Sequence, residues 1–379
     1  MNRWVRSLDS ATRPVLLCFS HLHWDFVFQR PQHLMTRAAA GHQVFYIEEP
    51  EHAAGPAHFR IRTVECGVTV LRPVLDFAFD RTTVERRLLS GIVAMLGARK
   101  FVHWFYTPLA LPLTEGLPCD VCVYDCMDEL SNFRFAPANL PEQERALMRK
   151  ADFVFTGGRS LFAAKRDLHP SVHLYPSSVD AEHFGSARGT LADPADQASI
   201  AQPRVGFFGV IDERMDLALV AQAADALPQV QFVMLGPLAE VQGADLPRAA
   251  NLHWLGRKSY TELPAYLSNW RAGWMPFALN DATRFISPTK TPEFLAAGLP
   301  VVSTAVPDVV TDYGQTGLVR IADREGIVRA LESVLIGARP GWLAKVDTKL
   351  SNMSWDATWG SMQTRVQAWH LLSAEMANA

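Results

Sequence analysis

The chain has 379 residues, of which 49% are hydrophobic and 20% charged, and its formal net charge is −3. This length allows about two domains of ordinary size, and the composition is that of a well-cored globular protein rather than a disordered or fibrous one. The small net charge, without any Lys/Arg run, gives no reason to expect a nucleic acid partner.

Apolar runs such as Val15–Phe19 have the length of core strands and fall far short of the ~20 residues that a membrane span needs. Residues 1–14 lack the apolar region of a signal peptide. We therefore expect a cytoplasmic protein, with peripheral contact at the inner face of the membrane left open.

A βαβ unit opens the chain. Val15–Phe19 predicts a buried strand, Pro31 begins an amphipathic helix that stops at Gly41, and residues 42–49 predict a second strand. This order implies a parallel sheet with ligands at the carboxyl ends of its strands. Because the first turn lacks G-x-G-x-x-G, we expect no dinucleotide in this half.

The loop after the first strand is rich in functional groups and falls on the rim of the expected cleft. We predict that it contacts acceptor or donor through His21, His23, Trp24, Asp25, Gln29 and Arg30. The alternative for the aromatic residues Trp24 and Phe28 is that they simply cover the core.

Carboxylates follow the strand in the segment DVCVYDCMDEL. A carboxylate in the cleft could hold an acceptor hydroxyl and take its proton, so we predict Asp125 and Asp128 as catalytic residues. The alternative for Asp128 is a cap on the following helix. Three cysteines also lie here, Cys119, Cys122 and Cys126, but a closed zinc site needs four ligands and the segment alternates like a buried strand, so we expect free thiols and no metal.

Residues 185–203 are small, polar and contain Pro and Gly, which is typical of an interdomain linker. The strands start afresh after it, at RVGFFG. We therefore predict a first domain at 1–184, a second at 204–345, and helices at 346–379.

The segment Phe285–Thr304 carries the signals of a short helix between a loop and a strand. Ser287 with Pro288, or Thr291 with Pro292, could begin the helix, and we favour the second pair. Such a helix start binds phosphate well, with Lys290 adding positive charge and Glu293 able to accept hydrogen bonds from two sugar hydroxyls. The alternative makes Lys290 a solvated charge and Glu293 a residue that complements the helix dipole.

The sequence SPTKTPEFLAAGLPVVST resembles the donor-binding segment of nucleotide-sugar glycosyltransferases of the GT-B fold, of the glycosyltransferase family 4 type. The resemblance implies an α/β protein with two facing Rossmann-like domains and a cleft between them, and C-terminal helices that pack back toward the first domain. It also implies that Glu293 holds the donor ribose. The family usually has a second Glu eight positions earlier, near the transferred sugar, where this chain has Phe285.

The same resemblance implies the other donor contacts. The family binds the diphosphate with an Arg just after a strand glycine and a Lys about six residues further on. Here Val210 stands in the first place, and Arg214 is the nearest candidate for the second. The alternative for Arg214 is that it pairs with an adjacent acidic residue. Backbone atoms near Gly256 would read a uracil edge. The predicted donor residues are Gly209, Arg214, Gly256, Arg257, Lys258, Asn280, Arg284, Ile286, Ser287, Pro288, Thr289, Lys290 and Glu293. Among them Arg214 and Lys290 are also predicted to be catalytic, and Asn280 and Arg284 to substitute for the missing Glu.

The function implied is transfer of a hexose from a nucleotide-diphosphate sugar, with UDP favoured, to a saccharide or glycolipid acceptor in bacterial-type surface polysaccharide or glycoconjugate synthesis. Retention at the anomeric carbon is expected. The nucleotide sugar is a co-substrate and no cofactor is expected. Since no D-x-D pair is found, we expect Lys, Arg and the helix dipole to neutralise the diphosphate without a metal. The rival functions are a sugar-nucleotide epimerase of the same fold and a catalytically weak nucleotide-sugar-binding subunit.

Overall fold

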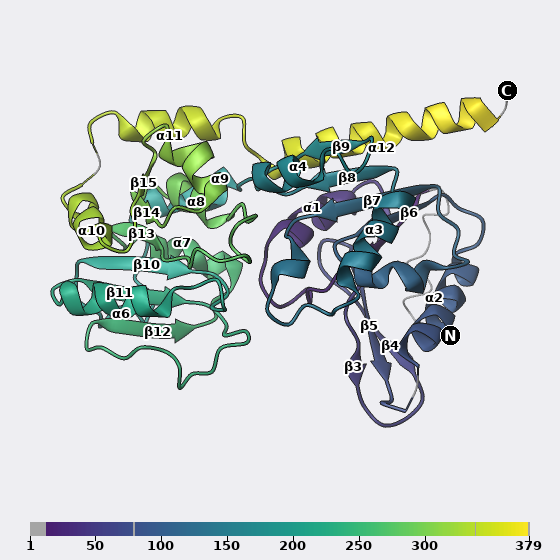
Figure 1. Cartoon of the computed structure of the whole chain (residues 1–379), viewed down its shortest axis with the longest axis horizontal. Coiled ribbons are helices and arrows are strands. Elements are labelled where there is room, and N and C mark those ends of the chain that lie inside the picture. The colour runs from purple at the N-terminus through teal and green to yellow at the C-terminus, as the bar shows by residue number, and fades with distance from the viewer. Residues whose placement is uncertain (1–12, 79, 338, 378–379) are drawn as a thin grey trace.

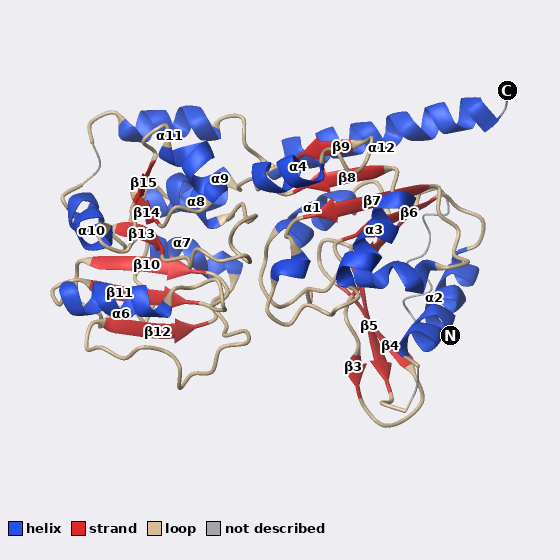
Figure 2. Cartoon of the chain, in the orientation of Figure 1, coloured by secondary structure: helices blue, strands red, loops and turns tan. Residues whose placement is uncertain are grey.

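The computed structural model describes residues 13–78, 80–337 and 339–377, and the expectation drawn from residues 1–14 falls almost entirely outside them. Two lobes lie side by side, each built on its own sheet, and the last helix runs from the second lobe along the first (Figure 1). Helices cover both faces of the sheets (Figure 2). The expected pair of facing Rossmann-like domains is confirmed.

The first domain is built on a sheet of nine described strands in the order β3-β5-β2-β1-β6-β7-β8-β9, with β4 pairing antiparallel to β5 and all other pairs parallel. The strands are β1 (Val15–Phe19), β2 (Gln43–Ile47), β3 (Glu51–His52), β4 (His58–Thr63), β5 (Thr69–Leu75), β6 (Phe101–Phe105), β7 (Val121–Cys126), β8 (Phe153–Thr156) and β9 (Val172–Leu174). Strands β1, β6, β7 and β8 are fully buried, as expected for a parallel sheet covered on both faces.

Helices of the first domain connect these strands. They are α1 (Arg30–Ala38), α2 (Arg81–Leu96), α3 (Leu140–Lys150) and α4 (Arg159–Lys165), with 3-10 turns at Pro108–Thr114 and Leu130–Asn132. The last helix, α12 (Trp355–Ala377), returns to this domain, where the buried Trp355 and Trp359 join a core cluster with Leu16 and Trp104. These tryptophans therefore have a core-packing role.

The second domain has a wholly parallel sheet in the order β12-β11-β10-β13-β14-β15. Its elements are β10 (Arg204–Phe208), α6 (Leu217–Ala226), β11 (Gln231–Leu235), β12 (Leu252–Gly256), α7 (Leu263–Leu267), β13 (Ala272–Met275), α8 (Lys290–Ala296), β14 (Val301–Ser303), α9 (Pro307–Val309), β15 (Val319–Ile321), α10 (Ile327–Leu335) and α11 (Trp342–Leu350). In such a sheet, ligands bind where the strand order reverses, which here is beside β10.

Residues 185–203 are not a free linker. Helix α5 (Ala181–Gly185) and the segment after it pack on the second domain, where Phe184, Ala187 and Ile200 belong to its core cluster. The guanidinium of Arg204 donates to Asp193 at 2.6 Å, which ties the segment to the start of β10. The chain therefore passes between the domains before residue 181, and the small, polar composition reflects a packed segment rather than a mobile one.

The described residues can also be compared with the expectations about membrane spans, cysteines and metals. No described helix is long and apolar enough to cross a membrane. Cys119, Cys122 and Cys126 are free thiols in and beside β7. Within the described ranges, no group of three or more His, Cys, Asp and Glu side chains is arranged to hold a metal ion.

Candidate functional site

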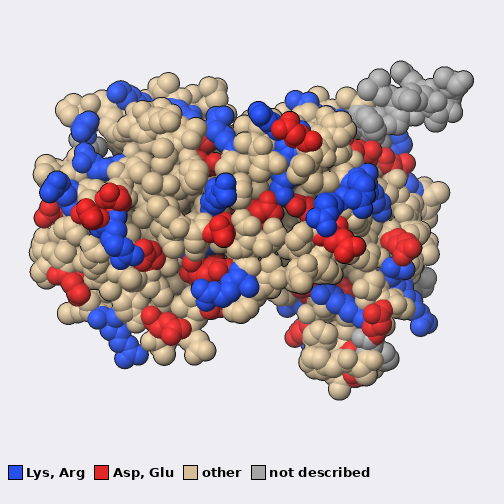
Figure 3. Space-filling model, viewed as in Figure 1, with Lys and Arg blue, Asp and Glu red and all other residues tan. Residues whose placement is uncertain are grey.

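Three connected cavities lie between the two domains. Their volumes are about 230, 80 and 480 Å³, and we call them the α8 cavity, the central cavity and the outer cavity. The first two share Gly209 and Lys290, and the last two share Asp128 and Arg214. In the space-filling view, acidic and basic side chains gather where the two lobes meet (Figure 3).

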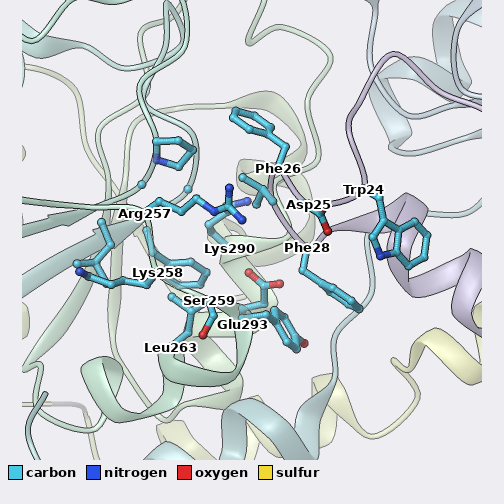
Figure 4. Close-up of a pocket in the computed structure, with 17 residues that line it drawn as sticks. Trp24, Asp25, Phe26, Phe28, Arg257, Lys258, Ser259, Leu263, Lys290 and Glu293 are labelled. Carbon is cyan, nitrogen blue, oxygen red and sulfur yellow. The ribbon is translucent and has the colours of Figure 1, made fainter. Parts of the chain in front are cut away.

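The α8 cavity is lined by both domains. Glu293 and Lys290 reach into it from α8, Arg257 and Lys258 from the loop after β12, and Phe28 from the loop after β1 (Figure 4). The ring of Phe28 lies 4.6 Å from that of Tyr260, so an aromatic contact between the domains closes one side of the cavity.

Glu293 is a buried carboxylate with an unused hydrogen-bonding atom. Its side chain is almost fully buried, and Oε2 has no partner. Burial raises the pKa of Glu293 to about 7, against the opposing effects of Lys290 and of the Thr289 side chain. Leaving a carboxylate oxygen buried without a donor costs free energy, which a ligand with hydroxyl groups would recover.

Lys290 lies against a strand end that only glycine fits. Gly209 has a φ of +143°, and a Cβ there would lie 2.7 Å from Cε of Lys290. Gly236, at the end of β11, has a φ of +154°, and a Cβ there would overlap the carbonyl oxygen of Gly209 at 1.7 Å. These glycines let the two strand ends approach each other and let the lysine cross them. Burial lowers the pKa of Lys290.

The start of α8 differs from both predicted starts. Thr289 is the N-cap, in αR conformation and without a side-chain hydrogen bond, so Lys290 rather than Pro292 is the first helical residue. Thr291 is instead fully buried, with its hydroxyl on Met275 Sδ at 3.5 Å. The prediction of Thr291 as the N-cap was wrong, because an N-cap hydroxyl bonds to a backbone N–H of its helix, whereas the hydroxyl of Thr291 bonds to Met275.

The central cavity holds the loop predicted to cradle phosphate. Ser287, Pro288 and Thr289 line it, and the N–H groups of Ser287 and Thr289 donate to no described residue. Ile286 also lines it, but its N–H reaches the carbonyl of Thr283 at 3.5 Å, so this amide is the least available. The loop therefore offers free donors to an anion.

Arg214 lines the central and outer cavities, but it is paired. Its Nε lies 3.0 Å from both carboxylate oxygens of Asp212, and its Nη2 lies 2.5 Å from Oδ2. The predicted alternative, pairing with an adjacent acid, is thus what the structure shows. The guanidinium also lies 5.5 Å from the ring centre of Phe133 in the first domain. Arg214 can still serve a phosphate, but only while sharing its charge with Asp212.

Asp128 lies where the central and outer cavities meet. Burial raises its pKa to about 6; Arg214 opposes this rise and Asp212 adds to it. At neutral pH this carboxylate is mostly ionised and able to accept a hydroxyl hydrogen. It does not cap the following 3-10 turn, which begins at Leu130 after Glu129.

The structure does not place Asp125 in the cleft, where the sequence predicted a catalytic carboxylate. Arg30 donates to its oxygens from Nε at 3.0 and 3.2 Å and from Nη2 at 2.8 Å, and Trp104 Nε1 lies at 3.3 Å. Asp125 is fully buried and lines none of the three cavities. Arg30 edges the central cavity, but its charge is held by Asp125 and its Nη1 donates to the carbonyl of Tyr175. The two residues form a buried structural pair.

In the loop after β1, some of the predicted residues line the cavities and one anchors the loop itself. His23 lies 3.3 Å from Glu48, which also accepts the N–H of Trp24 at 2.6 Å, so His23 anchors the loop and lines none of the cavities. Trp24 and Asp25 line the α8 cavity, Asp25 while paired with Arg62. The remaining two residues lie further along the cleft: Gln29 in the central and outer cavities and His21 in the outer one.

The structure does not bring Asn280 and Arg284, which were predicted to substitute for the missing Glu, into the cavities. Both are exposed, and neither lines any of the three cavities. Asn280 shapes its turn by accepting the N–H of Thr283 at 3.0 Å and donating to the carbonyl of Glu213. Phe285 packs against the core cluster of the first domain, so this position makes an apolar contact between domains.

Of the remaining donor candidates, Gly256 lies at the end of β12, and its carbonyl accepts the N–H of Gly236 at 2.9 Å. Lys258 pairs with Asp196 at 2.7 Å. Sequence reasoning missed several residues that the structure brings into the cleft: Phe26, Tyr260, Phe133, Phe135 and Glu240. Most are aromatic, and an aromatic residue in a loop cannot be told from a core residue by its spacing.

Known proteins resemble this chain in sequence and in fold. Residues 202–336 match the family described as Glycosyl transferases group 1. A Bacillus subtilis (strain 168) protein described as "Putative teichuronic acid biosynthesis glycosyltransferase TuaH" is 29% identical over 259 residues. The match spans 61% of this chain and 64% of that relative, so the chain matches less than two thirds of the relative's length.

Solved structures of low sequence identity share the whole architecture. The E. coli protein described as "Trehalose-6-phosphate from E. coli bound with UDP-2-fluoro glucose" superposes with a TM-score of 0.68 at 12% identity, covering 94% of this chain and 98% of that one. Sucrose-phosphate synthase from Thermosynechococcus elongatus gives 0.68 at 15% identity, with 96% and 100% covered. These matches establish the fold. Residues 202–336 are therefore a domain of the glycosyl transferases group 1 family, within a chain that has the GT-B fold of glycosyltransferases.

Proposed function

We propose that the protein is a glycosyltransferase that moves a hexose from a nucleotide-diphosphate sugar to a saccharide or glycolipid acceptor. The nucleotide that we propose is UDP. The observation that carries the proposal is the buried Oε2 of Glu293, which has no partner and lines the α8 cavity beside Lys290. A ribose supplies the hydroxyl donors that this carboxylate lacks. The family match and the UDP-sugar bound by the E. coli structure point the same way.

The three cavities suggest how the substrates are arranged. The nucleoside would occupy the α8 cavity, and its diphosphate would lie in the central cavity against the free amides of Ser287 and Thr289, with Lys290 and Arg214 opposing its charge. The acceptor would enter through the outer cavity. Its hydroxyl would approach the anomeric carbon from the face that the diphosphate leaves, and would bond to it as the bond to the diphosphate breaks. The hydroxyl proton would pass to Asp128, and the electrons of the broken bond would leave on the phosphate.

Three finer points belong to this proposal. Retention at the anomeric carbon follows from the family resemblance and is checked by NMR of the first product formed. Neutralisation of the diphosphate by Lys290, Arg214 and amides, without a metal, is checked by turnover in EDTA. A role in surface polysaccharide synthesis is supported by the description of the B. subtilis relative. The place of the reaction, in the cytoplasm or at the inner membrane face, is part of the proposal.

The decisive experiment titrates UDP- and GDP-sugars into the wild type and Glu293→Ala by calorimetry, and then measures donor turnover with and without acceptors. We expect Glu293→Ala to weaken donor binding by ~1–3 kcal/mol because charged hydrogen bonds to the ribose are lost. Asp281→Ala, which removes an exposed carboxylate outside the cavities, is the control. Equal affinity of wild type and Glu293→Ala would remove Glu293 from the site. Donor binding without hydrolysis or transfer would favour a binding subunit, and interconversion of the sugar without release of nucleoside diphosphate would favour an epimerase.

A further inference from the structure

The outer cavity is the part of the cleft whose ligand the proposed function does not yet define. It has a volume of about 480 Å³, within the usual range for small-molecule sites, and it meets the central cavity at Asp128 and Arg214. If the proposed function holds, the acceptor lies here. The chemistry of the lining then states what kind of acceptor fits.

The charges on the lining disfavour an anion. Five carboxylates line the cavity against two guanidinium groups, and both of the latter are already paired. Arg214 pairs with Asp212, and Arg81 pairs with Glu85 at 2.7 Å and with Glu49. No lining cation is therefore left free for a phosphate or carboxylate, and an anionic ligand would meet like charge.

Several polar atoms of the cavity can accept hydrogen bonds, beside Gln29 and Thr107, whose side chains can also donate. Burial lowers the pKa of His21 to about 4, so its ring is neutral at pH 7. Interaction with the backbone of Tyr106 opposes this lowering of the pKa, and Nδ1 of the ring is buried without a partner, so on a neutral ring it can accept a hydrogen bond. Asp128 and Glu240 add further acceptors. A ligand with several hydroxyl groups supplies the donors that these atoms lack.

Glu240 is an exposed residue of the cavity lining with an unusual backbone conformation. Its φ of +59° is the one positive φ among the described non-glycine residues, and its carboxylate has no ion-pair partner among them. Such a conformation costs of order 1–3 kcal/mol and persists where surrounding structure imposes it, often at ligand sites. An unpaired carboxylate placed in this way repels an anionic ligand at the mouth of the cavity.

Part of the lining is an apolar wall. Leu109, Leu130, Phe133 and Phe135 line it, and Phe135 is 65% exposed although it is a large hydrophobic side chain. A ligand that covers this wall with apolar surface gains roughly 25 cal/mol for each Å² removed from water. The wall therefore complements an apolar group attached to a sugar.

We propose that the acceptor is an uncharged glycoside, with free hydroxyls on the sugar and an apolar aglycone on the Phe133–Phe135 wall, and with no phosphate or carboxylate in the part that enters the cavity. The inference rests on the proposed function and specifies its acceptor. Glu240 sets the preference against anions, and Phe135 the preference for the apolar group.

The test compares matched ligands by calorimetry at low ionic strength, where exposed charges are least screened. Octyl glucoside, galactoside and mannoside are each paired with the corresponding octyl uronide and with the methyl hexoside, and all are titrated with and without UDP. For at least one sugar we expect the octyl hexoside to bind about tenfold or more tighter than either partner, a difference of ~1.4 kcal/mol.

Two variants and two controls identify the residues responsible. Glu240→Lys should reduce the preference for hexoside over uronide, and Phe135→Ser should reduce the preference for octyl over methyl, each by about threefold or more. Glu332→Lys and Phe77→Ser change an exposed Glu and an exposed Phe outside the cavity and should alter neither preference. Equal or tighter binding of the uronides, or binding of none of the octyl hexosides, would overturn the inference. Binding of UDP-sugars to the wild type is measured separately. If the wild type bound no UDP-sugar, that result would count against the proposed function instead.

Discussion

The carboxylate of Asp308, in the second domain, accepts the backbone N–H of Arg159, in the first domain, at 2.7 Å. Its other oxygen accepts the N–H of Ser160 at 3.0 Å, so this side chain satisfies the first turn of α4 from across the domain boundary. Carboxylates are favoured at such helix starts. This contact helps to hold the two domains in the arrangement that forms the three cavities.

Asp308→Asn should loosen that arrangement. The amide can accept only one of the two hydrogen bonds, and hydrogen bonds to a charged group contribute ~1.5–3 kcal/mol. We expect a larger radius of gyration in solution scattering and donor binding weakened by up to about tenfold, because the closed state is less populated. Asp312→Asn, which breaks the more exposed pair with Arg159, should have a smaller effect. Unchanged scattering and affinity in Asp308→Asn would contradict a clamping role.

Gly209→Ala should displace Lys290. The new methyl group would lie 2.7 Å from Cε of the lysine, at a φ of +143° that side chains rarely adopt. We expect donor affinity to fall by about tenfold or more as a charge-assisted contact with the diphosphate is lost. Gly317→Ala is the matched control, since it has a φ of +74° but no atom within 4 Å of the new Cβ. Comparable loss of donor affinity in both variants would assign the effect to backbone strain instead.

The sequence predicted most of the fold because burial and strand order follow from local patterns. The segment around Lys290 and Glu293 could also be predicted from a local pattern, because its loop, short helix and strand follow one another in the chain. The Arg30–Asp125 pair could not be predicted, because its members lie 95 positions apart and only the folded sheet brings them together. Likewise, the sequence showed Phe285 only as the loss of a Glu that lies near the transferred sugar in the family, and only the position of the first domain shows that it makes an apolar contact between domains.

Glu293→Gln should stabilise the ligand-free protein above neutral pH. In the wild type, burial raises the pKa of Glu293 to about 7, above its ordinary value of 4.5. As the pH rises from 4.5 to 7 the unfolded chain loses this proton before the folded protein does, so folding stability falls, by roughly 3 kcal/mol at most. We expect the variant to have the higher melting temperature at pH 8 and little advantage at pH 4.5.

The same titration should appear in donor binding. If the ionised carboxylate holds the ribose, wild-type affinity for a UDP-sugar should rise between pH 6 and 8, by up to about tenfold, because protons no longer compete with the ligand. Glu293→Gln should bind more weakly and show no such rise. The two phosphates of the ligand are diesters and do not titrate in this range. A wild-type affinity independent of pH would show that Glu293 binds no donor hydroxyl.

Asp128→Asn should separate chemistry from donor binding. Asp128 lies where the central and outer cavities meet, and the amide keeps the size of the side chain, so donor affinity should stay within about threefold. Turnover should fall by about 100-fold or more if Asp128 takes the acceptor proton. Because burial raises the pKa of Asp128 to about 6, wild-type kcat should decline as the pH falls through 6, and the residual activity of the variant should lack this decline. Asp281→Asn, an exposed carboxylate outside the cavities, should keep the wild-type profile. If Asp128→Asn retains both full turnover and the same pH dependence, another group accepts the proton, and the leaving phosphate becomes the next candidate.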